Sequence, residues 1–391
     1  MRSHALESNE KLIVFGSPKI GKKEIDEVIH SLESGWLGSG PKVAKFESDF
    51  AVYKDVSSEN VTAVNSCTAA LHIAMLSAGI RDGDEVITTP MTFCATVNSI
   101  IHAGARPVLA DIDPESLNID PDQIENHITD KTKAMVVVHF AGRPCDMDRI
   151  THIADKYNIL VIEDCAHAIE SEYCGKKTGT IGQFGCFSFY VTKNVVTGEG
   201  GMVISQEKEK SDLIRVLSLH GMDKDAWHRF SDDGYKHYHV TQCGFKYNMM
   251  DLQAAIGIHQ LSHVEINWKR RQDIWNLYQE AFSDLPVKCP KQPDNHMRHA
   301  YHLFTLMIDP QQLNICRDEF LNQMALKNIG LGVHYLSIPE HPYYQNSFGW
   351  KPEMFPNAMK VGRQTVSLPL SPKLTNDEVQ RIINAVRNVV C

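Results

Sequence analysis

One lysine stands where a nucleophilic amine would be useful. Lys193 lies between an aromatic run that ends at Tyr190 and a glycine-rich turn that begins at Gly198, within GTIGQFGCFSFYVTKNVVTGEGGM (179–202). Most lysines are solvated surface residues. Here the aromatic side chains predict partial burial, which lowers the pKa of an amine and frees its neutral form. We therefore predict that Lys193 forms a Schiff base with an aldehyde.

A carboxylate is predicted at the end of a buried strand upstream. NILVIEDCAHA (158–168) places Asp164 directly after an apolar run, where open α/β sheets form their ligand crevices. Pyridoxal phosphate (PLP) carries an aldehyde, and its ring withdraws electrons only while a carboxylate holds a proton on the ring nitrogen. Lys193 and Asp164 together predict a PLP enzyme. Taken alone, Asp164 could be a helix N-cap.

A phosphate site is predicted in VNSCTAALHIAM (64–75), which indicates a strand, a small polar turn and a helix. Helix N-termini bind phosphate through free backbone amides. Cys67 and Thr68 are the candidate phosphate contacts, with Ser188 as a hydroxyl donor. The same residues would serve plain N-capping equally well. Phe93, in PMTFCAT, could lie flat on a pyridine ring or belong to the core.

The elements that must position these residues alternate along the chain from about residue 61 to 204. Short β-branched runs separated by amphipathic helical patterns predict an α/β fold, with a mostly parallel sheet covered on both faces. A long helical stretch (249–282) follows and could carry the chain between domains. We expect a large PLP-binding domain (1–260) and a small α+β C-terminal domain (261–391).

Composition excludes several other classes of function. The 391 residues carry a formal net charge of −9 and no cluster of Lys and Arg, so nothing indicates binding to nucleic acid or to an anionic membrane. The first ten residues are polar, and no run approaches the ~18 apolar residues of a membrane span. We therefore expect a cytoplasmic protein that acts on small molecules.

Two motifs imitate other sites. GSPKIGKK (16–23) nearly spells a phosphate-binding P-loop, but Lys23 stands where Ser or Thr would bind magnesium, so nucleotide hydrolysis is not predicted. His296, His299 and His302 are spaced by three, which could suggest zinc. No flanking Cys or carboxylate completes a ligand set, so no metal is predicted.

The chain resembles the DegT/StrS-like family of PLP-dependent sugar aminotransferases nearly from end to end. The resemblance implies the aspartate-aminotransferase (type I) fold, with a sheet of the seven-stranded type. It is close to members that aminate UDP-4-keto-arabinose or 4-keto-6-deoxy sugars. The segments that carry it are LESGWLGSGPKVAKFE, NSCTAALHIAM, GDEVITTPMTF, VIEDCAHA, SFYVTKNVVTGEGGM, GFKYNMMDLQAAIG, IGLGVHY and SLPLSPKLT.

This resemblance implies roles for individual residues. Lys193 would bond PLP, Asp164 would pair with the ring nitrogen, and His167 would lie by the ring hydroxyl. Ser188 and Thr68 would hold the phosphate. A branch of the family that has His in place of the lysine dehydrates sugars, and Lys193 argues against that branch.

The resemblance also implies a homodimer, because Asn248 would reach the phosphate of the neighbouring subunit's cofactor. Candidate contacts to a sugar nucleotide are Trp36, Arg229 and His334.

We expect amino transfer from an amino acid, by resemblance glutamate, to the keto carbon of a nucleotide-linked keto-sugar in amino-sugar and cell-surface polysaccharide biosynthesis. Carbon 4 of a UDP- or GDP-linked sugar is the first choice, and carbon 3 of a dTDP-linked sugar is the second. The alternatives are PLP-dependent sugar dehydration, amino-acid transamination and, outside enzymes, a PLP-binding regulator.

Overall fold

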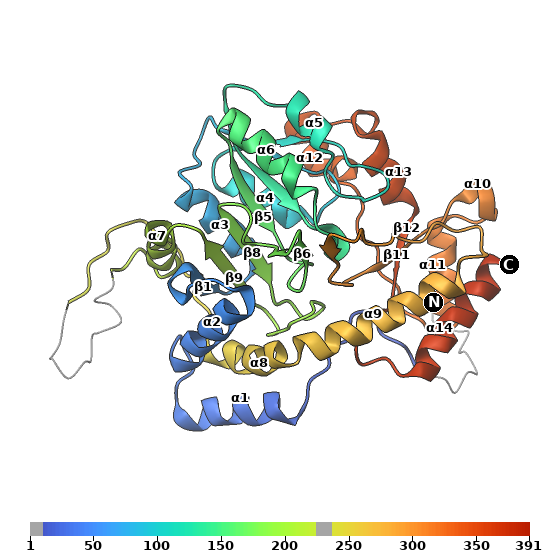
Figure 1. Ribbon diagram of the computed structural model, residues 1–391, viewed down its shortest axis with the longest axis horizontal. Helices are drawn as coiled ribbons and strands as arrows, with labels where there is room; N and C mark the ends of the chain where they lie inside the picture. Colours follow the sequence, from blue (N-terminus) through green and yellow to red (C-terminus); the bar gives the residue numbers. More distant parts are fainter. Residues whose placement is uncertain (1–10, 224–236) are drawn as a thin grey trace.

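A seven-stranded sheet forms the centre of the computed structural model, which describes residues 11–223 and 237–391 (Figure 1). Its strand order is β1-β9-β8-β5-β4-β2-β3. The strands are β1 (Val61–Val64), β2 (Glu85–Thr88), β3 (Arg106–Leu109), β4 (Thr132–Val138), β5 (Leu160–Asp164), β8 (Phe184–Ser188) and β9 (Gly201–Ser205). Strand β9 is antiparallel to both of its neighbours, and the other paired strands are parallel. The predicted α/β fold with a mostly parallel sheet is confirmed.

Alternate side chains of one strand enter opposite layers, as the two-residue period of a strand requires. Val136 of β4 packs in a core with helices α3 (Cys67–Ser77) and α7 (Lys208–Ser218). Its neighbour Val137 packs in another core with α6 (Met147–Tyr157). Helices therefore cover both faces of the sheet, which explains why most residues of its strands are apolar.

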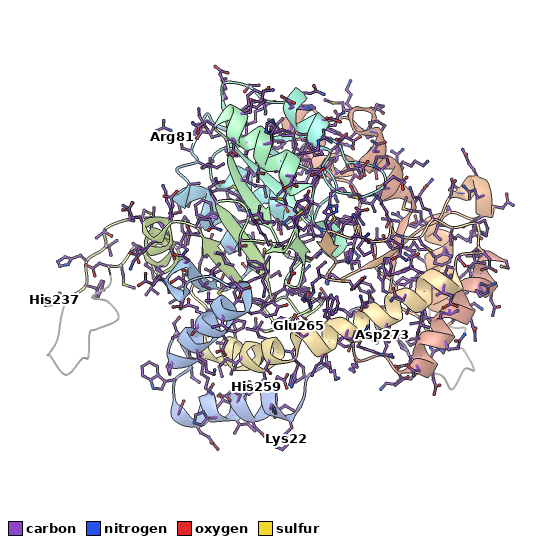
Figure 2. The ribbon with its side chains drawn as sticks, viewed as in Figure 1. Lys22, Arg81, His237, His259, Glu265 and Asp273 are labelled. Carbon is purple, nitrogen blue, oxygen red and sulfur yellow. The ribbon has the colours of Figure 1, made fainter. Side chains whose placement is uncertain are left out.

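Three further helices pack together beside the sheet: α1 (Lys22–Ser34), α2 (Pro41–Lys54) and α8 (Asp251–Ser262). The carboxylate of Asp251 accepts the backbone N–H groups of Lys42 and Val43 and so caps α2 from α8. His259 of α8 bonds to Glu27 of α1, and its side chain lies between these two helices (Figure 2).

The predicted long helix (249–282) is two helices, α8 and α9 (Val264–Ala281), because His263 leaves helical geometry with ψ near 1°. Helix α9 runs away from the sheet toward α11 (Arg317–Leu326) and α14 (Asn376–Val390) (Figure 1). These helices share a separate apolar core with the antiparallel pair β11 (Phe304–Met307) and β12 (Thr365–Leu368). Ile13 also packs in this core. The division into domains at residue 260 remains a prediction.

The remaining elements are short connections around these apolar cores. They are α4 (Cys94–His102), α5 (Pro121–Asn126), β6 (Glu172–Tyr173), β7 (Lys176–Lys177), β10 (Met297–Arg298), α10 (Pro310–Leu313), α12 (Pro342–Phe348) and α13 (Pro356–Gln364), with 3-10 turns at Ser58–Asn60, Phe140–Gly142, Ile338–Glu340 and Pro352–Met354. Within the described residues, every helix is too short or too polar to cross a membrane.

Candidate active site

A cavity of about 500 Å³ opens at the carboxyl ends of β5 and β8. This is the edge of an open α/β sheet where ligands bind. Eight residues singled out in the sequence line it: Cys67, Thr68, Phe93, Asp164, His167, Ser188, Lys193 and His334. The structure therefore brings together every residue predicted to hold PLP except Asn248, which is expected to serve the neighbouring subunit.

Lys193 lies in the turn between β8 and β9, where its backbone N–H donates to Tyr190. Burial lowers the pKa of its amine from 10.5 to about 8, although Cys67 and Asp164 oppose this shift. The direction is the predicted one, but of the four aromatic residues from Phe184 to Tyr190 only Tyr190 lines the cavity with Lys193. Phe187 and Phe189 point into the core under α2, because strand side chains alternate between the two faces.

Asp164 is the last residue of β5 and is only 4% exposed. Its Oδ2 accepts a 2.8 Å hydrogen bond from the hydroxyl of Thr96, and its Oδ1 accepts the N–H of Ala166 at 3.1 Å. Burial raises the pKa of this carboxyl, and the two hydrogen bonds only partly offset the rise. A cation in the cavity would stabilise the carboxylate, so the site suits a positively charged group.

The N-terminus of α3 forms another wall of the cavity. Ser66 is the N-cap, and its hydroxyl accepts the N–H of Ala69. Cys67 and Thr68 are the first two helical residues, so their N–H groups have no acceptor inside the helix. A Cβ on Gly201 would lie 2.5 Å from the backbone of Ser66, so the absence of a side chain allows β9 to pack closely against this turn.

His167 and Tyr335 form a hydrogen-bonded pair in the cavity wall. The N–H of Ala141 donates to Nδ1 of His167, and Nε2 of His167 lies 3.0 Å from the hydroxyl oxygen of Tyr335. Burial keeps the pKa of His167 well below its usual value, so the ring is neutral. Its single proton must then sit on Nε2, and Tyr335 accepts it. The tyrosine proton is left free to point into the cavity.

Phe93 and His334 complete the aromatic side of the cavity. Phe93 is 57% exposed at the start of α4, so the alternative that it belongs to the core is wrong. His334 bonds to the hydroxyl of Ser367 through Nδ1, and burial lowers its pKa to about 3. A neutral His334 offers its other nitrogen to a ligand.

Asn194, next to Lys193, is anchored on three sides. Its amide donates to Glu170 at 2.8 Å and to the carbonyl of Ala300, and its oxygen lies 2.9 Å from Nδ1 of His302. Glu170 in turn is paired with Arg271 of α9, and both side chains are fully buried. This network fixes the backbone that carries Lys193.

Two of the candidate substrate or cofactor residues do not line this cavity, and a third cannot be placed. Trp36 is 58% exposed in the connection between α1 and α2. Asn248 donates to the hydroxyl of Ser39. Arg229 lies outside the described residues.

One buried group, His139, Glu163 and Cys165, has the composition of a metal site. Glu163 already accepts the N–H groups of Gly179, Ile181 and Gly182 and lies 2.9 Å from His139. These bonds occupy the acceptor positions of the Glu163 carboxylate. We therefore interpret the group as structural: it connects β5 to the turn at residues 179–182.

Sequence reasoning missed Tyr335, Thr96 and the Glu170–Asn194 contact. Tyr335 follows His334 directly, so the candidate residue beside it was the available signal. Thr96 bonds to Asp164 from a different segment, and Glu170 reaches Asn194 across the fold; no local spacing indicates either contact.

The chain is similar to known proteins over nearly its whole length. A model of the DegT/DnrJ/EryC1/StrS aminotransferase family matches residues 18–387. The spore coat polysaccharide biosynthesis protein SpsC of Bacillus subtilis (strain 168) is 48% identical over 388 residues, which are 98% of this chain and 99% of that protein.

Solved structures of similar proteins cover almost the whole chain. The PLP form of the putative sugar aminotransferase Spr1654 from Streptococcus pneumoniae has a TM-score of 0.90 at 30% identity and covers 97% of this chain and 98% of its own. PseC of Helicobacter pylori, an aminotransferase involved in the biosynthesis of pseudoaminic acid, has a TM-score of 0.89 at 26% identity, with 97% and 99% covered. The predicted type I fold is thus confirmed, and the chain is an enzyme of the DegT/DnrJ/EryC1/StrS aminotransferase family.

Proposed function

We propose that this enzyme uses PLP to transfer an amino group from glutamate to the keto carbon of a nucleotide-linked keto-sugar, with carbon 4 of a UDP- or GDP-linked sugar as the first choice. The observation that carries the proposal is that Lys193 and Asp164, from separate segments, line one cavity beside the N-terminus of α3. An amine, a carboxylate and a phosphate-binding helix end are the three groups that PLP requires.

The residues present fit PLP by their own chemistry. Asp164 is a carboxyl whose pKa is raised by burial, and a protonated ring nitrogen beside it would stabilise the charged form. Cys67 and Thr68 offer N–H groups at a positive helix end, with the hydroxyl of Ser188 in the same cavity. Phe93 is exposed there and can pack against the ring.

When bound, PLP supplies an electrophilic carbonyl and a ring that withdraws electrons from the substrate carbon. Lys193 supplies the base. With a pKa of about 8, a useful fraction of its Nζ is neutral near neutral pH, so it can take a proton from the substrate carbon and return it elsewhere. Its position is held through Asn194 and Glu170.

The proton of Tyr335 provides the donor opposite this base. Because His167 donates to the oxygen of Tyr335, the tyrosine O–H is directed at an acceptor in the cavity. Such a donor stabilises an oxygen that gains negative charge, and we assign it to the ring hydroxyl of PLP or to the sugar.

The sugar substrate is supported by the relatives. SpsC is named for spore coat polysaccharide biosynthesis, and PseC for the biosynthesis of pseudoaminic acid. A role in amino-sugar synthesis for a surface polysaccharide follows by similarity. Carbon 3 of a dTDP-linked keto-sugar is the second candidate.

A homodimer completes the proposed site. Asn248 does not line the cavity of its own chain, and its side-chain oxygen is buried without a partner within the described residues. Helix α1 also exposes an apolar face at Ile25, Ile29 and Leu32, spaced to lie on one side of the helix. A second copy of the chain would cover such a face and bring its Asn248 to the phosphate.

A screen of nucleotide keto-sugars tests the substrate. The enzyme, PLP and glutamate are incubated with UDP-, GDP- and dTDP-linked 4-keto and 3-keto sugars, and the masses of the products are measured by mass spectrometry. We expect the keto oxygen to be replaced by an amino group and 2-oxoglutarate to be released. Loss of water without amination would identify a dehydratase. Turnover of keto acids alone would identify an amino-acid aminotransferase, and PLP binding without turnover would identify a regulator.

A further inference from the structure

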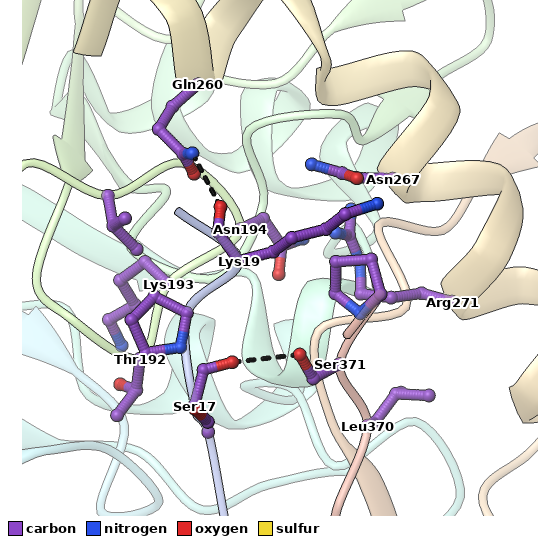
Figure 3. Close-up of a pocket in the computed structure, with 14 residues that line it drawn as sticks. Ser17, Lys19, Thr192, Lys193, Asn194, Gln260, Asn267, Arg271, Leu370 and Ser371 are labelled. Carbon is purple, nitrogen blue, oxygen red and sulfur yellow. Dashed lines mark hydrogen bonds between the residues drawn. The ribbon is translucent and has the colours of Figure 1, made fainter. Parts of the chain in front are cut away.

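A second and much smaller pocket lies behind the turn that carries Lys193 (Figure 3). We call it the rear pocket; its volume is about 30 Å³. Its walls come from four segments, and the residues are Gly16 to Lys19, Thr192 to Asn194 with Val196, Gln260 with Asn267 and Arg271, and Leu370 to Pro372. The P-loop-like GSPKIGKK thus contributes its first half to this pocket.

Two buried side chains of the rear pocket have hydrogen-bond donors without acceptors. Asn267 is 4% exposed, and its amide makes no hydrogen bond within the described part of the chain. Arg271 is 1% exposed; it pairs with Glu170 through Nη2, whereas its Nη1 has no partner. An unmade buried hydrogen bond is costly, so an unseen acceptor is expected between these groups.

The charge of the rear pocket is positive. Lys19 makes no ion pair within the described residues, and its side chain extends across the pocket toward Asn267 and Arg271 (Figure 3). No carboxylate is among the residues that line the pocket, and Glu170 meets Arg271 on the side that faces Asn194. Lys373 adds a further cation at Ser17.

The size of the rear pocket selects its occupant. A space of about 30 Å³ holds a particle of the size of water or a halide ion. Water accepts only two hydrogen bonds and leaves the excess positive charge unbalanced, whereas a halide accepts from every donor around it. We propose that the rear pocket binds one small monovalent anion of chloride size, held by Asn267, Arg271 and Lys19.

Such an anion would tie three parts of the fold together. It would join the segment 16–19 to α9. Because Arg271 of α9 pairs with Glu170, and Glu170 accepts from Asn194, it would also be linked to the turn that contains Lys193. Because it binds only the folded chain, it stabilises that chain by RT ln(1 + c/Kd) at a free anion concentration c, a gain that continues to grow with the logarithm of the anion concentration once the site is full.

Bromide in crystals of the PLP-loaded enzyme tests the site directly. We expect an anomalous peak within hydrogen-bond distance of Asn267 and Arg271. Bromide at other positions, with a water alone in the rear pocket, would overturn the proposal.

Thermal unfolding of the PLP-loaded enzyme tests binding in solution. Sodium chloride is compared with sodium gluconate at equal ionic strength, because gluconate is too large for the pocket. We expect chloride to raise the Tm by about 2 °C over gluconate at a concentration well above its dissociation constant, with a rise that follows the logarithm of the chloride concentration. Equal Tm values in the two salts would contradict the proposal.

Two variants and one control make the assignment specific. Asn267→Asp places a fixed carboxylate in the pocket, so the chloride response should be lost. Lys19→Met changes an exposed residue and leaves folding intact, and it should move the onset of the Tm rise to several-fold higher chloride. Lys360→Met removes a lysine from a different cavity and should keep the wild-type response. A wild-type response in both pocket variants would refute the anion site.

Discussion

Thr96 donates a 2.8 Å hydrogen bond to the Oδ2 of Asp164, and this bond fixes a buried carboxylate at the end of β5. Asp164→Asn should keep the shape of the contact but lose the negative charge that holds a ring proton on PLP. Proton removal from the substrate carbon should fall about 100-fold, measured as deuterium exchange at the α-carbon of glutamate. Thr96→Val keeps the charge and should have a much smaller effect. An unchanged rate in Asp164→Asn would make Asp164 a cap only.

Tyr335→Phe should remove the hydrogen-bond donor that His167 directs into the cavity. We expect kcat to fall about 30-fold, since a hydrogen bond to a developing charge is lost while the ring remains. The matched control is Tyr344→Phe, which breaks a bond to Asn98 away from the cavity and should leave kcat near wild type. Equal kcat values in the two variants would remove Tyr335 from the reaction.

The pH dependence of Lys193 follows from its lowered pKa. In enzyme freed of PLP, an amine-reactive reagent should label Lys193 faster as the pH rises. The curve of labelling rate against pH should have its midpoint near pH 8. Peptide mapping distinguishes the label on Lys193 from any label on Lys54, whose pKa is also lowered to about 8 but whose side chain is fully buried. A midpoint near the usual pKa of lysine would show that the amine is solvated.

The same shift affects stability with a defined sign. The pKa of Lys193 falls from 10.5 to about 8 on folding, so between these values the unfolded chain binds the extra proton. This group therefore makes the free energy of unfolding rise with pH across that window. Lys193→Met should flatten that part of the pH profile of the PLP-free enzyme.

Subunit mixing tests the shared site. If Asn248 serves the neighbouring chain, Lys193→Ala and a strongly impaired Asn248→Asp variant should complement each other, because one site of a mixed dimer has both native residues. Activity above that of either parent is expected after dissociation and reassociation. If activity does not rise although mass spectrometry verifies subunit exchange, Asn248 does not contribute to the site of the neighbouring chain.

The residues found from sequence share one property: each follows a strand or opens a helix in a recognisable pattern. Lys193, Asp164 and Thr68 could be predicted because their positions depend on local elements of the α/β fold. Tyr335 and the Glu170–Asn194 contact depend on segments that only the tertiary fold brings together.

Two features of the fold escaped prediction for a physical reason. The break at His263 interrupts no apolar period, since α8 and α9 both continue the same spacing. The reversal of β9 also leaves no trace, because a strand buried on both faces is apolar in either direction. Periodicity reports burial, and it does not report direction or small breaks.

The central claim is that Lys193 supports amino transfer in two separate half-reactions. Enzyme loaded with PLP is mixed with ¹⁵N-glutamate without an acceptor, freed of excess glutamate, and then given a UDP-linked 4-keto sugar. We predict 2-oxoglutarate in proportion to enzyme in the first step and an equal amount of ¹⁵N-labelled amino sugar in the second, with neither product from Lys193→Ala. A labelled product from Lys193→Ala at the wild-type level, or 2-oxoglutarate without ¹⁵N in any nucleotide sugar tested, would contradict it.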